Sequence, residues 1–136
     1  MKSITTYIHF AGNCRQAMQF YQKCLGGELT LMTYPDASGK PNSAPDATIM
    51  HSQITRNGSP MVMASDTTPE GPVKAGNNFS VSVDCESIEE IERLFTAIGA
   101  NGKVRLPLSN MPWGARFGML TDSFGIQWIF NCALGK

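Results

Sequence analysis

The chain of 136 residues is long enough for one domain with a buried core, and its 11 basic and 11 acidic residues cancel. These charges are spread along the sequence, so it has neither the basic stripe that binds nucleic acid nor a charged tail. No apolar run approaches the roughly 20 residues that span a bilayer, and residues 1–7 lack the apolar segment of a signal peptide. We therefore expect a cytoplasmic protein that binds neither nucleic acids nor membranes.

The first half of the chain begins with a strand and a helix. Residues 4–10 alternate between apolar and polar side chains, which predicts a strand. A helix is expected over residues 13–25, with Asn13 as its N-cap and Gln16 completing a capping box. Glycines at 26 and 27 end it. Its apolar face is formed by residues at helical spacing: Cys14, Ala17, Met18, Tyr21, Cys24 and Leu25.

A further alternating strand carries the most reactive side chain of the first half. Over residues 49–55, one face holds His51 and Gln53 and the other holds Met50 and Ile54. Such a strand has one apolar face that meets a helix and one mixed face. The mixed face is expected to line the concave side of the sheet.

Turns and loops separate these segments. The pair at residues 57–58, Asn-Gly, favours a hairpin because both residues tolerate a positive φ. Loops rich in Pro, Gly, Ser, Thr and Asp cover residues 35–46 and 66–77 and are expected at a cleft rim. Asp66 ends a strand, and it either caps the turn at residues 67–68 or contributes to a pocket.

The second half repeats this programme. Residues 78–83 alternate as a strand, and a helix is expected over residues 87–98, with Ser87 and Glu90 as its capping box. Strand-like runs follow, and residues 122–125 form a second hairpin turn. In the last strand, residues 126–131, one face carries Ile126, Trp128 and Phe130 and the other Gln127, Ile129 and Asn131.

This repetition predicts an α+β fold of two βαβββ units that form a curled mixed β-sheet around a cleft, with the helices on the convex side. The domain would span residues 1–136, with unit one at about 1–66, a linker at about 67–76 and unit two at about 77–136. A cleft between two such halves is where a small ligand would bind.

The mixed strand faces supply the candidate site residues. His51 could act as a base or donor in the pocket, be held by its neighbours as a structural residue, or ligate a metal. Arg116 follows Trp113 and could clamp a carboxylate or phosphate, or pin its loop by an ion pair with Asp122 or Asp66. The remaining candidates for ligand binding are Gln53, Asn78, Trp113 and Gln127. Four cysteines scattered singly, Cys14, Cys24, Cys85 and Cys132, are expected as buried thiols in a reducing compartment.

Several stretches resemble the PhnB-like branch of the vicinal oxygen chelate superfamily, which includes glyoxalase I, extradiol dioxygenases and bleomycin-resistance proteins. They are residues 10–21 (FAGNCRQAMQFY), 25–29 (LGGEL), 63–66 (MASD), 78–83 (NFSVSV), 113–118 (WGARFG), and 122–128 with 131–132. This branch is also called 3-demethylubiquinone methyltransferase-like. No glycine-rich loop follows a strand and opens a helix, as a nucleotide-type cofactor would need.

The resemblance implies positions for a metal site. Members that use a metal place four His or Glu ligands on the concave strands, and these positions fall on Thr6, His51, Asn78 and Ile129 of this chain. Of these, His51 alone is a good ligand. His9 lies three residues from Thr6 and is expected on the opposite face of its strand.

We therefore expect a PhnB-like protein that binds a small polar molecule in the cleft without a catalytic metal or other cofactor, and that forms a homodimer as its relatives do. Whether it catalyses a reaction is left open. One alternative is a metal-dependent enzyme resembling glyoxalase or a dioxygenase that uses His51. The other is a protein that sequesters a drug or toxin.

Overall fold

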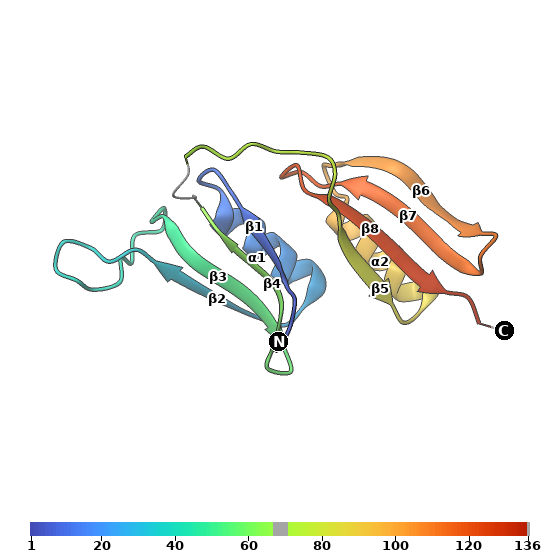
Figure 1. Ribbon diagram of the computed structural model, residues 1–136, viewed down its shortest axis with the longest axis horizontal. Helices are drawn as coiled ribbons and strands as arrows, with labels where there is room; N and C mark the ends of the chain where they lie inside the picture. Colours follow the sequence, from blue (N-terminus) through green and yellow to red (C-terminus); the bar gives the residue numbers. More distant parts are fainter. Residues whose placement is uncertain (67–70, 136) are drawn as a thin grey trace. The chain divides into compact units, whose positions relative to one another are not determined.

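The computed structural model describes residues 1–66 and 71–135. The chain divides into two compact units, Met1–Lys74 and Ala75–Lys136. The division falls within the linker expected at about 67–76, of which residues 67–70 lie outside the described part. Each unit contains its own four-stranded sheet and its own helix (Figure 1).

Unit one consists of β1 (Thr6–His9), α1 (Cys14–Leu25), β2 (Glu28–Thr33), β3 (Ile49–Arg56) and β4 (Ser59–Ser65). The strand order in the sheet is β1-β4-β3-β2, with β1 parallel to β4 and the other neighbours antiparallel. This is the predicted βαβββ arrangement, in which α1 leads from β1 to β2 at the other edge of the sheet and the antiparallel run β2-β3-β4 places β4 beside β1.

Unit two has the same topology. It consists of β5 (Val81–Cys85), α2 (Ile88–Ile98), β6 (Lys103–Met111), β7 (Ala115–Thr121) and β8 (Gln127–Ala133), in the sheet order β5-β8-β7-β6. Here β5 is parallel to β8, as β1 is to β4. The predicted repeat of two βαβββ units is therefore confirmed. None of the described helices is long and apolar enough to cross a membrane.

Each helix covers one face of its own sheet, and the core lies between them (Figure 1). In unit one the buried side chains from the strands come from alternate positions and meet those of α1: Ile8, Ile54, Val62 and Ala64 pack with Ala17, Met18 and Tyr21. In unit two the corresponding layer is formed by Leu120, Trp128 and Phe130 with Ile91, Leu94 and Ile98. The centres of both apolar helix faces expected from the sequence are thus confirmed as core, whereas Cys24, Leu25, Ile88 and Phe95 at their margins are only partly buried.

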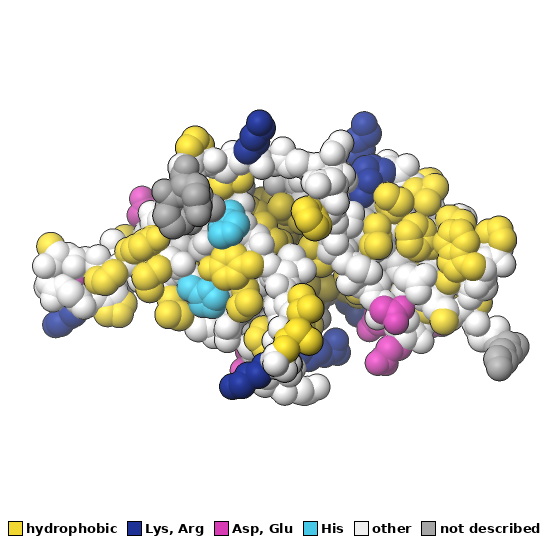
Figure 2. Space-filling view, in the orientation of Figure 1, with side chains coloured by type: hydrophobic (Ala, Val, Ile, Leu, Met, Phe, Trp, Pro, Cys, Tyr) yellow, Lys and Arg dark blue, Asp and Glu magenta, His cyan; other side chains and the backbone are white. Residues whose placement is uncertain are grey.

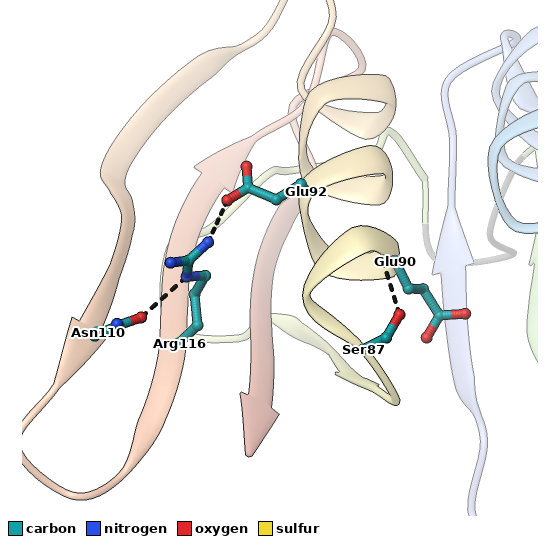
Figure 3. A network of polar contacts seen from close by, with 5 residues as sticks. All are labelled: Ser87, Glu90, Glu92, Asn110 and Arg116. Carbon is teal, nitrogen blue, oxygen red and sulfur yellow. Dashed lines mark hydrogen bonds and ion pairs between the residues drawn. The ribbon is translucent and has the colours of Figure 1, made fainter. Parts of the chain in front are cut away.

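The two helices begin differently. Ser87 caps α2 as predicted, because its Oγ accepts a hydrogen bond of 3.1 Å from the backbone N–H of Glu90, and the Glu90 carboxylate accepts one from the N–H of Glu86 (Figure 3). The expected cap of α1 is wrong. Asn13 occupies the N-cap position but makes no side-chain cap bond. The first N–H of α1, that of Cys14, donates instead to Asp66.

Both predicted hairpin turns are present. Asn57 and Gly58 have φ values of 53° and 80° and join β3 to β4. The turn at residues 122–125 joins β7 to β8, and Asp122 Oδ1 organises it by accepting from the N–H groups of Phe124 and Ile126.

The start of the strand expected over residues 78–83 was predicted wrongly. Residues 78–80 precede β5, which begins at Val81. Val81 pairs with Trp128 in parallel register, so continuing the pairing backwards would place residues 78–80 opposite residues 125–127, where the chain leaves the turn at 122–125. Of these, only Gln127 belongs to β8, as its first residue, so most of residues 78–80 have no strand to pair with.

Candidate functional site

The face of the unit-one sheet that α1 does not cover, called the open face below, carries the chemically useful side chains of this unit. The alternation of side chains along each strand decides which residues belong to this face. Ile8 and Ala64 point to the helix, so Tyr7, His9 and Met63 point to the other face. Ser52 and Ile54 are buried beneath α1, so His51 and Gln53 share the open face, as predicted. Figure 2 shows the histidine side chains on one face, flanking a hydrophobic group.

A short chain of hydrogen bonds links three of these residues. The hydroxyl of Tyr7 lies 3.0 Å from Nδ1 of His51, and Nε2 of His51 lies 3.4 Å from Oε1 of Gln53. Because Oε1 can only accept, Nε2 of His51 is a donor. In neutral His51, Nδ1 then accepts from the Tyr7 hydroxyl, whereas in the imidazolium it donates to the Tyr7 oxygen. Nε2 therefore presents an N–H in both protonation states.

Three aromatic rings adjoin one another on the open face. The ring centre of Tyr7 lies 5.1 Å from that of His9 and 5.6 Å from that of His51, with interplanar angles of 38° and 30°. Tyr7 is 38% exposed, His9 is exposed and His51 is partly buried. On β2, Met32 pairs with His51 and is also exposed. Tyr7 and His9 were not among the site residues expected from the sequence.

The structure corrects the expectation that Thr6 shares a sheet face with His51, while His9 does lie on the face of β1 opposite to Thr6, as expected. Thr6 pairs with Val62, which is buried, and it alternates with Tyr7 along β1. Thr6 therefore lies on the face that holds Val62, and His9 shares the open face with His51. The sequence contained a signal for the face of Thr6. Thr6 alternates in step with the apolar Ile8 and Phe10, which are both buried, so the three side chains belong to the same face of the strand.

The positions implied for a metal do not fit a metal. Thr6 and His51 lie on opposite faces of their sheet, so they cannot converge on one ion. Asn78 lies before β5 rather than in it, and Ile129 has no ligand atom. Among residues 1–66 and 71–135, no group of three or more His, Cys, Asp or Glu side chains is close enough to hold a metal. A catalytic zinc-type site uses about three protein ligands.

In unit two, Gln127 and Ile129 lie on the sheet face opposite to the buried Trp128 and Phe130. Gln127 donates from Nε2 to the carbonyl oxygen of Gly76, at 3.2 Å, and so ties β8 to the segment before β5. Trp113 stands at the turn between β6 and β7, is 66% exposed, and meets Phe117 edge to face at 5.9 Å. The ligand-binding roles of Gln127, Trp113 and Asn78 stay predictions.

Arg116 lies on the helix-covered face of β7. It lies on the same face as the buried Gly118 and Leu120, at positions two and four residues before them. Its Nη1 forms an ion pair of 2.5 Å with Glu92 of α2, and its Nε donates to Asn110 of β6 (Figure 3). Arg116 thus forms an ion pair, but the predicted partners Asp122 and Asp66 are wrong, because its partner is Glu92. The carboxylate of Asp122 is engaged by its own turn and by the indole N–H of Trp128, at 2.8 Å. The ligand role of Arg116 stays a prediction.

Asp66 is buried and has a structural position. Its Oδ1 accepts from the N–H of Cys14 and its Oδ2 from the N–H of Ile49, both at 2.8 Å. It thus joins the end of β4 to the start of α1 and the start of β3. The expected turn at residues 67–68 lies outside the described residues.

The buried thiols are poor nucleophiles. Burial raises the pKa of Cys14 from 9.0 to about 11, and burial likewise raises the pKa of Cys85 to about 11, with a smaller contribution from Glu90. A thiol with such a pKa is almost fully protonated near neutrality, and the thiolate is the nucleophilic form. These two cysteines behave as core residues, as expected.

The sheet orders β1-β4-β3-β2 and β5-β8-β7-β6, with one helix covering each sheet, define the fold of the glyoxalase/bleomycin resistance/dioxygenase class. A member of that class from Burkholderia phytofirmans PsJN has the same fold, with a TM-score of 0.66 at 14% identity, covering 96% of this chain and 97% of its own. The family model described as 3-demethylubiquinone-9 3-methyltransferase matches residues 2–130, and the chain belongs to this family.

Individual relatives agree with this assignment. The chain is 32% identical to Protein YjdN of Escherichia coli (strain K12), over 94% of this chain and 93% of that protein. The crystal structure of PA1353 from Pseudomonas aeruginosa has a TM-score of 0.83 and 38% identity, covering 99% of this chain and all of its own. The PhnB protein of Bacillus cereus, whose name also carries 3-demethylubiquinone-9 3-methyltransferase, has a TM-score of 0.77 at 28% identity, covering 97% and 100%.

Proposed function

We propose that this PhnB-like protein binds a small polar molecule on the open face of the unit-one sheet, without a catalytic metal. The observation that carries the proposal is the Tyr7–His51–Gln53 hydrogen-bond chain, which presents the Nε2–H of His51 toward Gln53 at a distance of 3.4 Å. A hydrogen bond of this length is weak. A carbonyl or carboxylate oxygen of a ligand would make a shorter bond with Nε2 and release Gln53 to contact the ligand with its amide.

The residues around the start of α1 favour ligand binding over methyl transfer with a nucleotide-type cofactor, although the family is named for a methyltransferase. The connection from β1 to α1, residues 10–13, contains one glycine rather than a glycine-rich loop. The helix N-terminus, where a cofactor phosphate would bind, already holds the Asp66 carboxylate. A phosphate there would meet a like charge.

Proton NMR of the imidazole rings tests the proposal. The chain has two histidines and therefore two Cε1–H signals, so each can be followed separately. Small carbonyl and carboxylate compounds, among them acetate, pyruvate and benzoate, are titrated into the full chain while both signals are followed. We expect at least one compound to shift the His51 signal saturably. His51→Ala should abolish binding of that compound, and Gln53→Ala should weaken it. Gln19→Ala, on α1, is the matched control and should bind unchanged.

Two outcomes contradict the proposal. One is that none of the compounds shifts the His51 signal up to millimolar concentration. The other is that His51→Ala binds the compound as tightly as the unaltered protein, which would place the ligand elsewhere. The melting temperature of each variant is measured alongside, so that unfolding is not mistaken for loss of binding.

We further propose that the protein is a homodimer in the reducing environment of the cytoplasm. Large apolar side chains are exposed on both units, including Met32 and Tyr34 in unit one and Phe79, Val104 and Trp113 in unit two. Exposed apolar surface of this kind favours association. The buried thiols of Cys14, Cys85 and Cys132 suit a compartment that keeps cysteines reduced.

A further inference from the structure

We infer that the molecule recognised by the open face is a planar conjugated ring that carries a hydrogen-bond acceptor at its edge, and that it lies flat on Tyr7 between the imidazoles of His9 and His51. This inference rests on the proposed function and narrows it to one class of ligand. It adds Tyr7 and His9 to the binding surface as stacking residues.

The first step is how the three rings meet. A phenol O–H and the Nδ1 lone pair of an imidazole both lie in the planes of their rings. A hydrogen bond of 3.0 Å between Tyr7 and His51 with only 30° between the ring planes therefore joins the rings at their edges rather than stacking them. The ring centre of His9, two residues from Tyr7 along β1, lies 5.1 Å from that of Tyr7 with 38° between the planes. The edge contact therefore leaves the broad faces of the Tyr7 ring uncovered by His51.

The second step is that these broad faces are accessible. Tyr7 and His9 are exposed although both are aromatic and stand on a sheet whose other face is covered by α1. Figure 2 shows the two histidine side chains with a hydrophobic side chain between them at the surface. Met32, opposite His51, adds an exposed thioether beside the rings. Thioethers make favourable contacts with aromatic rings.

The third step is what such a surface prefers. A flat surface of π-systems contacts a planar ring over its whole face, whereas a puckered saturated ring touches it at a few atoms. Aromatic pairs contribute about 0.5–1.5 kcal/mol beyond area burial. The strand residues assigned to this part of the open face, Tyr7, His9, His51, Gln53 and Met63, carry no fixed charge, so stacking and hydrogen bonding provide the selectivity. The Nε2–H of His51, 3.4 Å from Oε1 of Gln53, supplies the donor for the acceptor group.

The experiment compares a planar aromatic probe, naphthalene-2-carboxylate, with its saturated, puckered analogue, decahydronaphthalene-2-carboxylate. Both have the same carbon skeleton and the same acceptor group. Each is titrated into the full chain while the two His Cε1–H signals and the ligand protons are observed. We expect naphthalene-2-carboxylate to bind about fivefold or more tightly, to shift both His signals, and to show upfield ring-current shifts of its own protons.

Variants of Tyr7 separate the ring from the hydroxyl. Tyr7→Leu should remove most of the preference for the planar probe, and Tyr7→Phe should retain it while weakening both probes. His9→Leu should reduce the preference without changing the His51 hydrogen bonds. Tyr34→Leu is the matched control, because Tyr34 is another exposed tyrosine, at 46%, that follows β2. It should leave both affinities unchanged.

The outcomes distinguish this inference from the function on which it rests. If the two probes bind equally through His51, the inference is wrong and binding on the open face stands. If neither probe shifts a His signal and the broader set of compounds also fails, both are wrong. A planar preference that survives Tyr7→Leu would also overturn the inference, because the stacking surface would then lie elsewhere.

Discussion

Asp66 shows how much one buried carboxylate can organise. It accepts hydrogen bonds from two backbone N–H groups that belong to different elements, at the start of α1 and at the start of β3. Backbone donors buried without a partner are costly. Asp66 thus replaces the local cap expected from Asn13 by a contact between residues 52 positions apart in the sequence.

We predict that Asp66→Ala lowers the free energy of unfolding by about 3 kcal/mol, since it leaves two buried N–H groups unpaired. Urea denaturation followed by far-UV circular dichroism measures the change. Asp46→Ala, in an exposed loop, is the control and should change it by about 0.5 kcal/mol or less. Equal midpoints for the two variants would show that Asp66 does not hold these elements together.

Arg116 can be tested for a structural and a ligand role at once. Its ion pair with Glu92 joins side chains that are 25% and 52% exposed, and exposed pairs contribute at most about 1 kcal/mol. We expect Arg116→Ala and Glu92→Ala to destabilise the protein by similar small amounts, with a coupling below about 1 kcal/mol in a double-mutant cycle. Loss of ligand affinity in Arg116→Ala but not in Glu92→Ala would establish the ligand role predicted from the sequence.

From the raised pKa values of two cysteines we predict that the free energy of unfolding falls at alkaline pH. The pKa values of Cys14 and Cys85 are raised from 9.0 to about 11 in the folded chain, mainly by burial. A raised folded pKa means that the folded state holds the proton more tightly than the unfolded state. The resulting stability is complete below pH 9 and is lost as the pH rises toward 11.

This is checked by measuring the urea midpoint from pH 7 to pH 11. The fall above pH 9 should be smaller in Cys14→Ala, which retains the Ser52 hydrogen bond to Ala64, and smaller again when Cys85→Ala is added. An unchanged alkaline fall in the double variant would assign it to other groups.

At the scale of elements, the two helices share a pattern but start by different means. Ser87 and Asn13 are both N-cap residues by position, yet only Ser87 makes a side-chain cap bond. The repeat in the sequence is therefore a repeat of topology and hydrophobic pattern. The start of α1 is satisfied by Asp66 at the end of β4, and the start of α2 by its own N-cap, Ser87.

We predict that Ser87→Ala lowers the free energy of unfolding by about 1 kcal/mol, the usual value of an N-cap. Asn13→Ala should cost clearly less, because the Asn13 side chain makes no cap bond. Thermal and urea unfolding of both variants provide the comparison. Equal losses would mean that Asn13 contributes to the start of α1 in solution.

At the scale of the whole molecule, we expect two chains to associate. Both units expose large apolar side chains, and Trp113 and Phe79 are the most exposed of them beyond the N-terminal residues, at 66% and 83%. Light scattering at tens of micromolar should give twice the chain mass of 14.8 kDa. Trp113→Ser or Phe79→Ser should shift the mass toward the monomer if either residue lies in the interface. A monomer mass for the unaltered protein would refute the dimer.

The sequence by itself determined what depends on local periodicity and turn chemistry. Alternation and helical spacing predicted both βαβββ units, the apolar faces of α1 and α2, the Asn57-Gly58 turn and the shared face of His51 and Gln53. These features are set by neighbours within a few residues, so the pattern contains them. The Ser87 cap belongs to this group, because its partner is three residues away.

Only the tertiary structure decided the features that depend on which strands lie side by side. Arg116 lies on the face of β7 that α2 covers. The residues of β7 are apolar on both faces, with Phe117 and Met119 on one and Gly118 and Leu120 on the other, so alternation alone could not predict which face Arg116 occupies. Its partner Glu92 lies on α2, 24 residues away. Alternation places His9 on the face of Tyr7, but His9 comes beside His51 only because β1 pairs with β4, in a parallel register between segments more than 50 residues apart.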